Sequence, residues 1–232
     1  MPKPDLLGFW VWQVHHFTRQ NHGILAFVSR AYGVPVKLAE RVAITLTDVA
    51  AVLATIPFVT PFRLTLLDAW GWHLHTIGFG VFLCAWGAYG LAWRPSRFRA
   101  APRLELVSLA LMTFYLPLFV FRDAFSAVYI YLTAHGLQYL VFMCFVAATP
   151  RIRRVRALAA LAAFTILGGG IMRSLHEPSL WGSHGFALLG VAFGITMWHF
   201  VLDAGVWRLS EPFQRSYMLE RFGFLRGSAR FG

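Results

Sequence analysis

Histidine is the residue type in this sequence with the greatest capacity for chemistry. The 232-residue chain has nine histidines, and most of them fall inside long apolar runs rather than between them. Ionisable side chains inside a membrane-spanning segment are costly, face the bundle interior and often mark a site. Neutral imidazoles on facing helices can bind iron, copper or zinc while nearby carboxylates and amides orient the rings. The histidines therefore predict a metal centre inside the protein.

The first apolar run carries the densest group of polar residues. On a helix with 100° per residue, His15, Arg19 and His22 share one face. His16 shares an adjacent face with Gln20. Such a helix cannot face lipid on all sides, so we expect it to be central in a bundle or to line a cavity.

Depth estimates relate this run to two later ones. At about 1.5 Å per residue, His16 lies roughly 21 Å from Arg30 at the cytoplasmic end of its helix, and His135 lies at a similar depth. His199 falls near the level of His22 and is followed at i+4 by Asp203. We therefore expect the first, fifth and seventh runs to converge on one polar centre.

The predicted metal ligands are His15, His16, His22, His135, His199 and Asp203. The predicted polar network around them is Gln20, Gln138, Arg19, Asp48 and His73.

Arg19 and Asp48 lie at similar estimated depths in neighbouring runs. An unpaired Arg inside the bilayer would cost several kcal/mol. We therefore expect a buried ion pair that fixes the first helix against the second, with a proton path as the alternative reading.

Four further histidines lie near the predicted external surface. Adjacent and next-but-one helix positions diverge, so at most one of His73 and His75 can serve a given centre. His176 and His184 fall in or beside the last outer connection; we expect them to be loop residues, with an extracellular metal site or a role in substrate entry as the alternative.

Seven apolar runs are long enough to suggest transmembrane helices, each of which needs about 20 apolar residues. The expected spans are residues 6–29, 38–59, 69–93, 104–121, 124–148, 157–172 and 186–207. The fold class predicted is an all-α integral membrane protein, a bundle of about seven transmembrane helices.

Arginine and lysine alternate between the connections and indicate the orientation. The odd-numbered connections and the C-terminal tail hold Arg30, Lys37, Arg41, Arg94, Arg97, Arg99, Arg103, Arg151, Arg153, Arg154, Arg156, Arg208, Arg215, Arg221, Arg226 and Arg230. The even-numbered connections hold only Arg63, Arg122 and Arg173. The positive-inside rule then predicts an external N-terminus and a cytoplasmic C-terminus.

Composition agrees with a membrane domain. The chain is 58% hydrophobic and 13% charged, against roughly 25% charged in an ordinary soluble domain. The formal net charge of +11 sits in short blocks between apolar runs, which indicates orientation in a bilayer rather than nucleic-acid binding. We expect one polytopic domain over residues 1–207 and a basic, aromatic tail over residues 208–232, either interfacial or solvated, in a bacterial inner membrane.

Three families share features with this chain without sharing its motifs, and one of them, the bacterial carotene-cleaving dioxygenases, also buries a histidine-ligated iron among membrane helices. Rhodopsins also have seven spans, but the only lysines are Lys3 and Lys37, so no retinal Schiff base can form in the seventh run. The chain resembles membrane desaturases and hydroxylases in its histidine content, but it lacks their HxxxH and HxxHH boxes. No residue roles are carried over from any of these families.

Three functions follow from these patterns. The first is a non-haem iron or di-iron oxygenase, hydroxylase or desaturase, with copper or zinc as other metals, that acts on a lipid-soluble substrate with an electron-donor protein. The second is a haem-b electron-transfer protein with two axial histidines. The third is a transporter or a non-catalytic membrane subunit, in which the same residues form a proton path or pack against partner helices.

Overall fold

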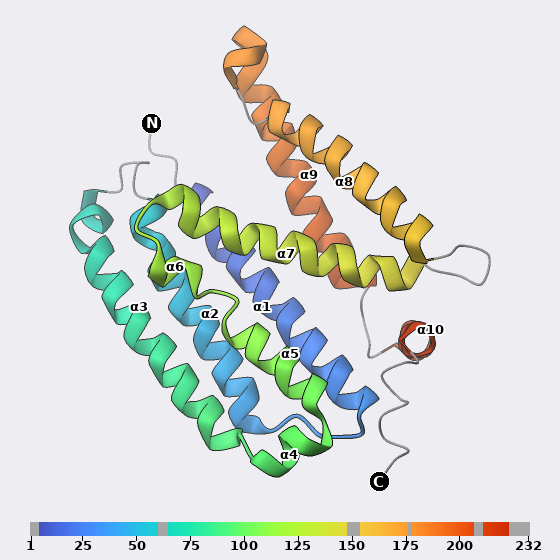
Figure 1. Ribbon diagram of the computed structural model, residues 1–232. Helices are drawn as coiled ribbons and strands as arrows, with labels where there is room; N and C mark the ends of the chain where they lie inside the picture. The colour runs from blue at the N-terminus through green and yellow to red at the C-terminus, as the bar shows by residue number, and fades with distance from the viewer. Residues whose placement is uncertain (1–4, 60–64, 148–153, 176–177, 207–210, 223–232) are drawn as a thin grey trace. The chain divides into compact units, whose positions relative to one another are not determined.

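The computed structural model describes residues 5–59, 65–147, 154–175, 178–206 and 211–222, and every regular element in these ranges is a helix (Figure 1). The long helices are α1 (Asp5–Ala31), α2 (Leu38–Val59), α3 (Thr65–Ala92), α7 (Ala124–Ala147), α8 (Arg154–Leu175) and α9 (Gly185–Val206). The short ones are α4 (Pro95–Ala100), α5 (Pro102–Met112), α6 (Pro117–Val120), η2 (Pro178–His184) and α10 (Pro212–Arg221). The all-helical class is confirmed over the described residues.

The fourth predicted span is not one helix. It is divided into α5 and α6 by a turn, in which the Leu116 N–H donates to the Thr113 carbonyl at 3.0 Å. Pro117 has no N–H and its ring crowds the preceding turn, so it favours a new helix start over continuation. At about 1.5 Å per residue, the eleven residues of α5 rise roughly 16 Å, which is short of the roughly 30 Å hydrocarbon core.

Two helical segments in the described ranges are long and apolar enough to cross a membrane, Leu38–Phe58 and Trp70–Ala92. Ile130–Cys144 and Val155–Ile171 are shorter apolar segments. α1 is long enough to cross a membrane but is less apolar than these two segments, since it carries His, Arg, Gln and Asn side chains in its middle turns. The seven-span bundle therefore stays a prediction.

The chain forms two compact units, and the boundary falls within α7. The first unit extends to Gly136 and holds α1 to α6 with the first half of α7; the second is Leu137–Gly223. Each unit is described by itself.

In the first unit, α2 lies between α1 and α3 (Figure 1). Its contact with α3 is close because both helices present small residues. A Cβ added at Gly78 would lie 2.8 Å from the Ala50 carbonyl oxygen, and Ala50 and Ala54 are fully buried. Small residues allow two backbones to approach closely, which is a common way of packing helices in membranes.

Lys37 joins the start of α2 to the end of α3. Its backbone N–H donates to Glu40 Oε2 at 2.7 Å, and its ammonium donates to the Ala92 carbonyl at 2.5 Å. A carboxylate in the first turn and a cation at the C-terminal carbonyls both complement the helix dipole. Nearby, the Tyr89 hydroxyl donates to Glu105 Oε2 at 2.9 Å. Sequence reasoning did not identify Glu40 and Glu105, which are each only 1% exposed.

The start of α7 is capped by Asp123. The Ser126 backbone N–H donates to Asp123 Oδ1 at 2.7 Å, as expected of an N-cap carboxylate. This hydrogen bond lowers the pKa of Asp123 below its ordinary value.

In the second unit, α10 packs on the end of α7. Tyr217 donates to the Val146 carbonyl at 3.3 Å, and the rings of Phe142 and Phe222 are 5.2 Å apart. Met218 is buried, whereas Phe213 is exposed. The first part of the predicted tail thus forms a short helix with one packed side and one exposed phenylalanine, whose ring stacks with that of Tyr217.

Candidate metal centre and polar network

The structure places the polar residues of α1 on two different sides of the helix. His16 contributes to the buried core of the first unit, whereas His15 and Arg19 are exposed. Consecutive residues on a helix point about 100° apart, so one helix can serve two separate clusters. One cluster, the buried centre, lies where α1 meets α7. The other, the α1–α2 seam, lies where α1 meets α2.

The buried centre is the place where His16 of α1 meets His135 of α7. Gln13 and Gln20 lie about one turn before and after His16, and Tyr131 lies one turn before His135. The rings of His16 and His135 lie edge to face with their centroids 6.0 Å apart. Phe17 stacks on His135 at 3.9 Å. The structure thus brings together two predicted ligands that are far apart in the sequence.

Tyr115 supports this centre from the turn between α5 and α6. Its hydroxyl donates to the Val14 carbonyl at 2.8 Å and lies 3.0 Å from Thr18 Oγ1. Its ring is fully buried and lies 5.8 Å from that of Tyr131. Sequence reasoning missed both tyrosines; the available signal was that Tyr131 precedes His135 by one helical turn.

Three buried polar atoms of the centre have no hydrogen-bond partner among the described residues. They are the side-chain carbonyl oxygens of Gln13 and Gln20 and the hydroxyl of Tyr131. A buried polar group left unsatisfied costs about 1–3 kcal/mol. Buried polar groups of this kind are usually satisfied by ordered water.

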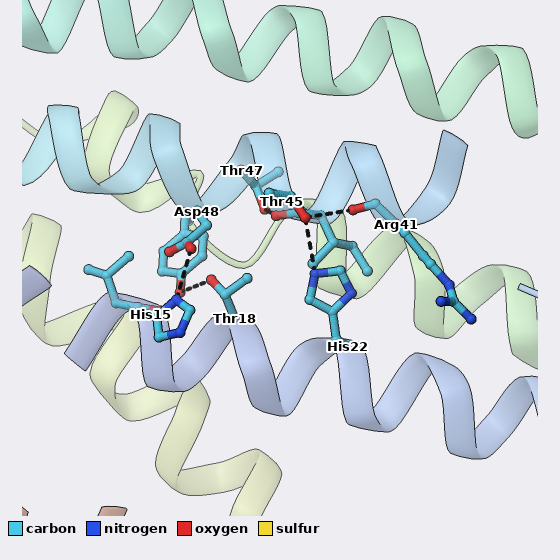
Figure 2. A network of polar contacts seen from close by, with 10 residues as sticks. His15, Thr18, His22, Arg41, Thr45, Thr47 and Asp48 are labelled. Carbon is cyan, nitrogen blue, oxygen red and sulfur yellow. Dashed lines mark hydrogen bonds and ion pairs between the residues drawn. The ribbon is translucent and has the colours of Figure 1, made fainter. Parts of the chain in front are cut away.

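The α1–α2 seam consists of His15, Arg19 and His22 of α1 and Arg41, Thr45 and Asp48 of α2. Figure 2 shows five of these residues along the line where the two helices meet. His15 Nδ1 lies 3.4 Å from Asp48 Oδ2. Thr45 Oγ1 lies 3.3 Å from His22 Nε2.

These contacts replace the ion pair expected between Arg19 and Asp48. Asp48 lies against His15, and the Arg19 side chain is exposed without a carboxylate partner among the described residues. The expectation was wrong because matching depth does not fix rotation about the helix axis. His15, one turn before Arg19, is the residue directed at α2 at the depth of Asp48.

The second unit holds the last predicted pair. His199 Nε2 lies 3.2 Å from Asp203 Oδ2 on α9. Tyr139 of α7 donates to Asp203 Oδ1 at 3.4 Å, and its ring lies 5.5 Å from that of His199. A carboxylate in this position fixes the orientation of an imidazole. Tyr139 had not been predicted.

Other candidate residues have different surroundings in the structure. His75 Nε2 lies 2.8 Å from the Leu118 carbonyl, while His73 is exposed and packs near Trp70 with centroids 5.6 Å apart. His184 is exposed in the described part of the last outer connection. His176 lies outside the described residues, and Gln138, half-buried on α7, belongs to the second unit.

Within the described ranges, no three or more His, Cys, Asp or Glu side chains are placed to share a metal ion. The buried centre offers two imidazoles. Comparison with protein-family models, with curated proteins and with solved structures gave no match. Function is therefore inferred from the residues themselves.

Proposed function

We propose that this chain is an integral membrane protein whose buried centre binds a transition metal and that it is a metal-dependent oxidoreductase acting on a lipid-soluble substrate. The observation that carries the proposal is the contact between His16 and His135. The proposal includes about seven spans, an external N-terminus, a cytoplasmic C-terminus and a bacterial inner membrane.

Exposed apolar side chains support the membrane placement. Leu83 on α3, Phe164 on α8 and Trp198 on α9 are each more than half exposed within the structure. Large apolar side chains along several helices need a covering that is not water. Together with the two long apolar helices and the alternating arginines, they favour a bilayer.

Two imidazoles from different helices supply part of a coordination sphere. Metal–nitrogen distances are about 2.0–2.1 Å, so the ligating nitrogens must approach within about 4 Å of each other. Ring centroids 6.0 Å apart are compatible with that distance after a small side-chain adjustment. Gln20 and Tyr131 would hold water or orient the rings. His199 with Asp203 belongs to the other unit, and its participation as a further ligand stays a prediction.

Such a centre suits redox chemistry on an apolar substrate. Imidazole is a good ligand for iron, copper and zinc, and a centre with few protein ligands keeps positions open for dioxygen and substrate. Iron, as one ion or two, is the metal that the proposal expects. An oxygenase, hydroxylase or desaturase of this kind also needs an electron-donor protein.

Stoichiometric metal analysis of the purified full-length protein tests the proposal. We expect at least about one iron or copper per chain, lost in His16→Ala and in His135→Ala because each change removes an imidazole from the centre. His184→Ala, in an exposed histidine, should retain the metal. Absence of iron, copper, manganese and zinc after gentle purification would overturn the proposal, as would retention of metal in both core variants with an unchanged elution volume.

The same pair of imidazoles favours a haem-b electron-transfer protein as the second candidate. Two axial histidines from different helices hold haem in many membrane cytochromes. An absorption spectrum separates the two candidates, since a haem protein shows a Soret band and a non-haem centre does not.

A further inference from the structure

The α1–α2 seam is the second polar cluster of the first unit, and the buried centre does not use it. His15, Arg19 and His22 occupy successive turns on one face of α1. Arg41, Thr45 and Asp48 line the facing edge of α2, as the close-up in Figure 2 shows. Side chains of the seam are largely accessible within this unit, since Arg19 and Arg41 are exposed and the His15 side chain is 60% exposed.

The contacts within the seam fix the imidazoles but not the guanidinium groups. Thr45 has one hydroxyl proton and donates it to the Arg41 carbonyl at 3.0 Å. At 3.3 Å from Thr45 Oγ1, His22 Nε2 is then the donor in that contact. Asp48, the one carboxylate of the seam, is engaged by His15.

Positive charge therefore exceeds negative charge in the seam. Arg19 and Arg41 are two permanent cations, and Asp48 is a single anion. Neither arginine has a carboxylate partner among the described residues. If the helices are embedded as proposed, the Arg19 guanidinium in the middle of α1 cannot face hydrocarbon without a large energetic cost.

Apolar side chains border the seam at its outer end. Trp12, one turn before His15, is 50% exposed, and Val49, next to Asp48, is 45% exposed. The cationic part thus lies toward the cytoplasmic end of both helices and the apolar part toward the external end. That order matches an amphiphile with its head group toward the cytoplasm.

We propose that the α1–α2 seam binds the anionic head group of a long-chain amphiphile, a carboxylate or a phosphate ester, through Arg19 and Arg41. His15 and His22 add hydrogen-bond donors, and the acyl chain lies along Trp12 and Val49. Arginine recognises both head groups through paired N–H donors. This inference rests on the membrane placement within the proposed function and not on the metal.

Binding to the full-length protein in a neutral maltoside detergent tests the seam. The probes are hexadecanoate, dodecyl phosphate and, as the uncharged control, hexadecanol. We expect the two anions to bind more tightly than the alcohol. Arg19→Gln and Arg41→Gln should each weaken anion binding roughly 10- to 100-fold, because each removes a charge-assisted hydrogen-bond partner. Arg19→Lys should recover part of the affinity by restoring the charge.

Arg30→Gln is the matched control, since Arg30 is exposed on the same face of α1 but lies two turns beyond His22. It should bind both anions as the unchanged protein does. Tighter binding of only one anion identifies the head group and supports the proposal. Equal binding of hexadecanol, or unchanged anion affinity in both glutamine variants, overturns it. Metal content, measured on the same samples, should not change in these variants, so failure of the seam and failure of the metal centre are distinguishable.

Discussion

The consecutive histidines of α1 have different surroundings. His15 lies against Asp48 in the exposed seam, whereas His16 lies against His135 in the buried centre. The sequence indicated that these residues face different directions, since adjacent helix positions diverge by about 100°. The apolar residues of α1 also indicate the core side, since Val14, Phe17, Leu25 and Val28 share one face and are buried. His15 lies off that face and is exposed.

Tyr115 makes two buried side-chain hydrogen bonds in the core of the first unit. Its hydroxyl joins the α5–α6 turn to α1 through the Val14 carbonyl and Thr18. Tyr115→Phe should lower the free energy of unfolding by about 1 kcal/mol, the usual net value of such a bond. Thermal or denaturant unfolding of the purified protein in detergent measures this change.

Tyr131→Phe is the control for that change, to be compared in metal-free protein. The Tyr131 hydroxyl is equally buried but has no hydrogen-bond partner among the described residues, so its removal should cost less than the Tyr115 change. If both substitutions lower stability equally, the Tyr115 hydrogen bonds do not hold α1 in place.

Some side-chain contacts could be predicted from the sequence and others could not, because contacts between helices depend on more than spacing. Pairs within one helix, such as His199 with Asp203, follow from spacing alone and are found at 3.2 Å. Pairs between helices depend on rotation about each axis, which a depth estimate does not contain. Arg19 was therefore paired with Asp48 in error, and Tyr115 and Tyr139 were not identified.

At the scale of elements, some helix boundaries were predicted closely and others were not. The sixth run, residues 157–172, was bounded by Arg156 and Arg173, but α8 (Arg154–Leu175) includes both arginines. The predicted second run and α2 have the same bounds, Leu38–Val59, and the fifth run differs from α7 by one residue. The fourth run failed because apolar length alone does not reveal a break. Pro117 was the available signal, since proline interrupts a helix at the preceding turn.

The packing of α2 on α3 depends on Gly78. A methyl group there would meet the Ala50 carbonyl oxygen at 2.8 Å and Leu53 Cβ at 3.1 Å. Gly78→Ala should therefore destabilise the protein by about 1–3 kcal/mol, the typical cost of overpacking. The measurement is the midpoint of thermal unfolding in detergent.

Gly80→Ala is the matched control on the same helix. No atom lies within 4 Å of a Cβ at Gly80, and alanine has the higher helix propensity. This variant should unfold at the same temperature as the unchanged protein or slightly above it. A Gly80 variant as unstable as the Gly78 variant would show that close approach at Gly78 is not what limits the substitution.

At the scale of the whole molecule, the sequence predicts an orientation and the structure describes two compact units. Alternation of arginine between connections is a property of the entire chain and cannot be read from one helix pair. Conversely, the boundary within α7 after Gly136 was not predicted, because α7 is one continuous helix across it.

The orientation can be tested with single cysteines and a membrane-impermeant maleimide. In a background with Cys84→Ala and Cys144→Ala, Leu180→Cys lies in an outer connection and Ser96→Cys in an arginine-rich one; both positions are exposed. We expect Leu180→Cys to be labelled in intact cells and Ser96→Cys only after the membrane is permeabilised, because arginine-rich connections stay cytoplasmic.

Labelling of both in intact cells would refute the orientation. Labelling of neither, even after permeabilisation, would show that these connections are covered. The seam depends on the same membrane placement, since a guanidinium within the bilayer needs an anionic partner.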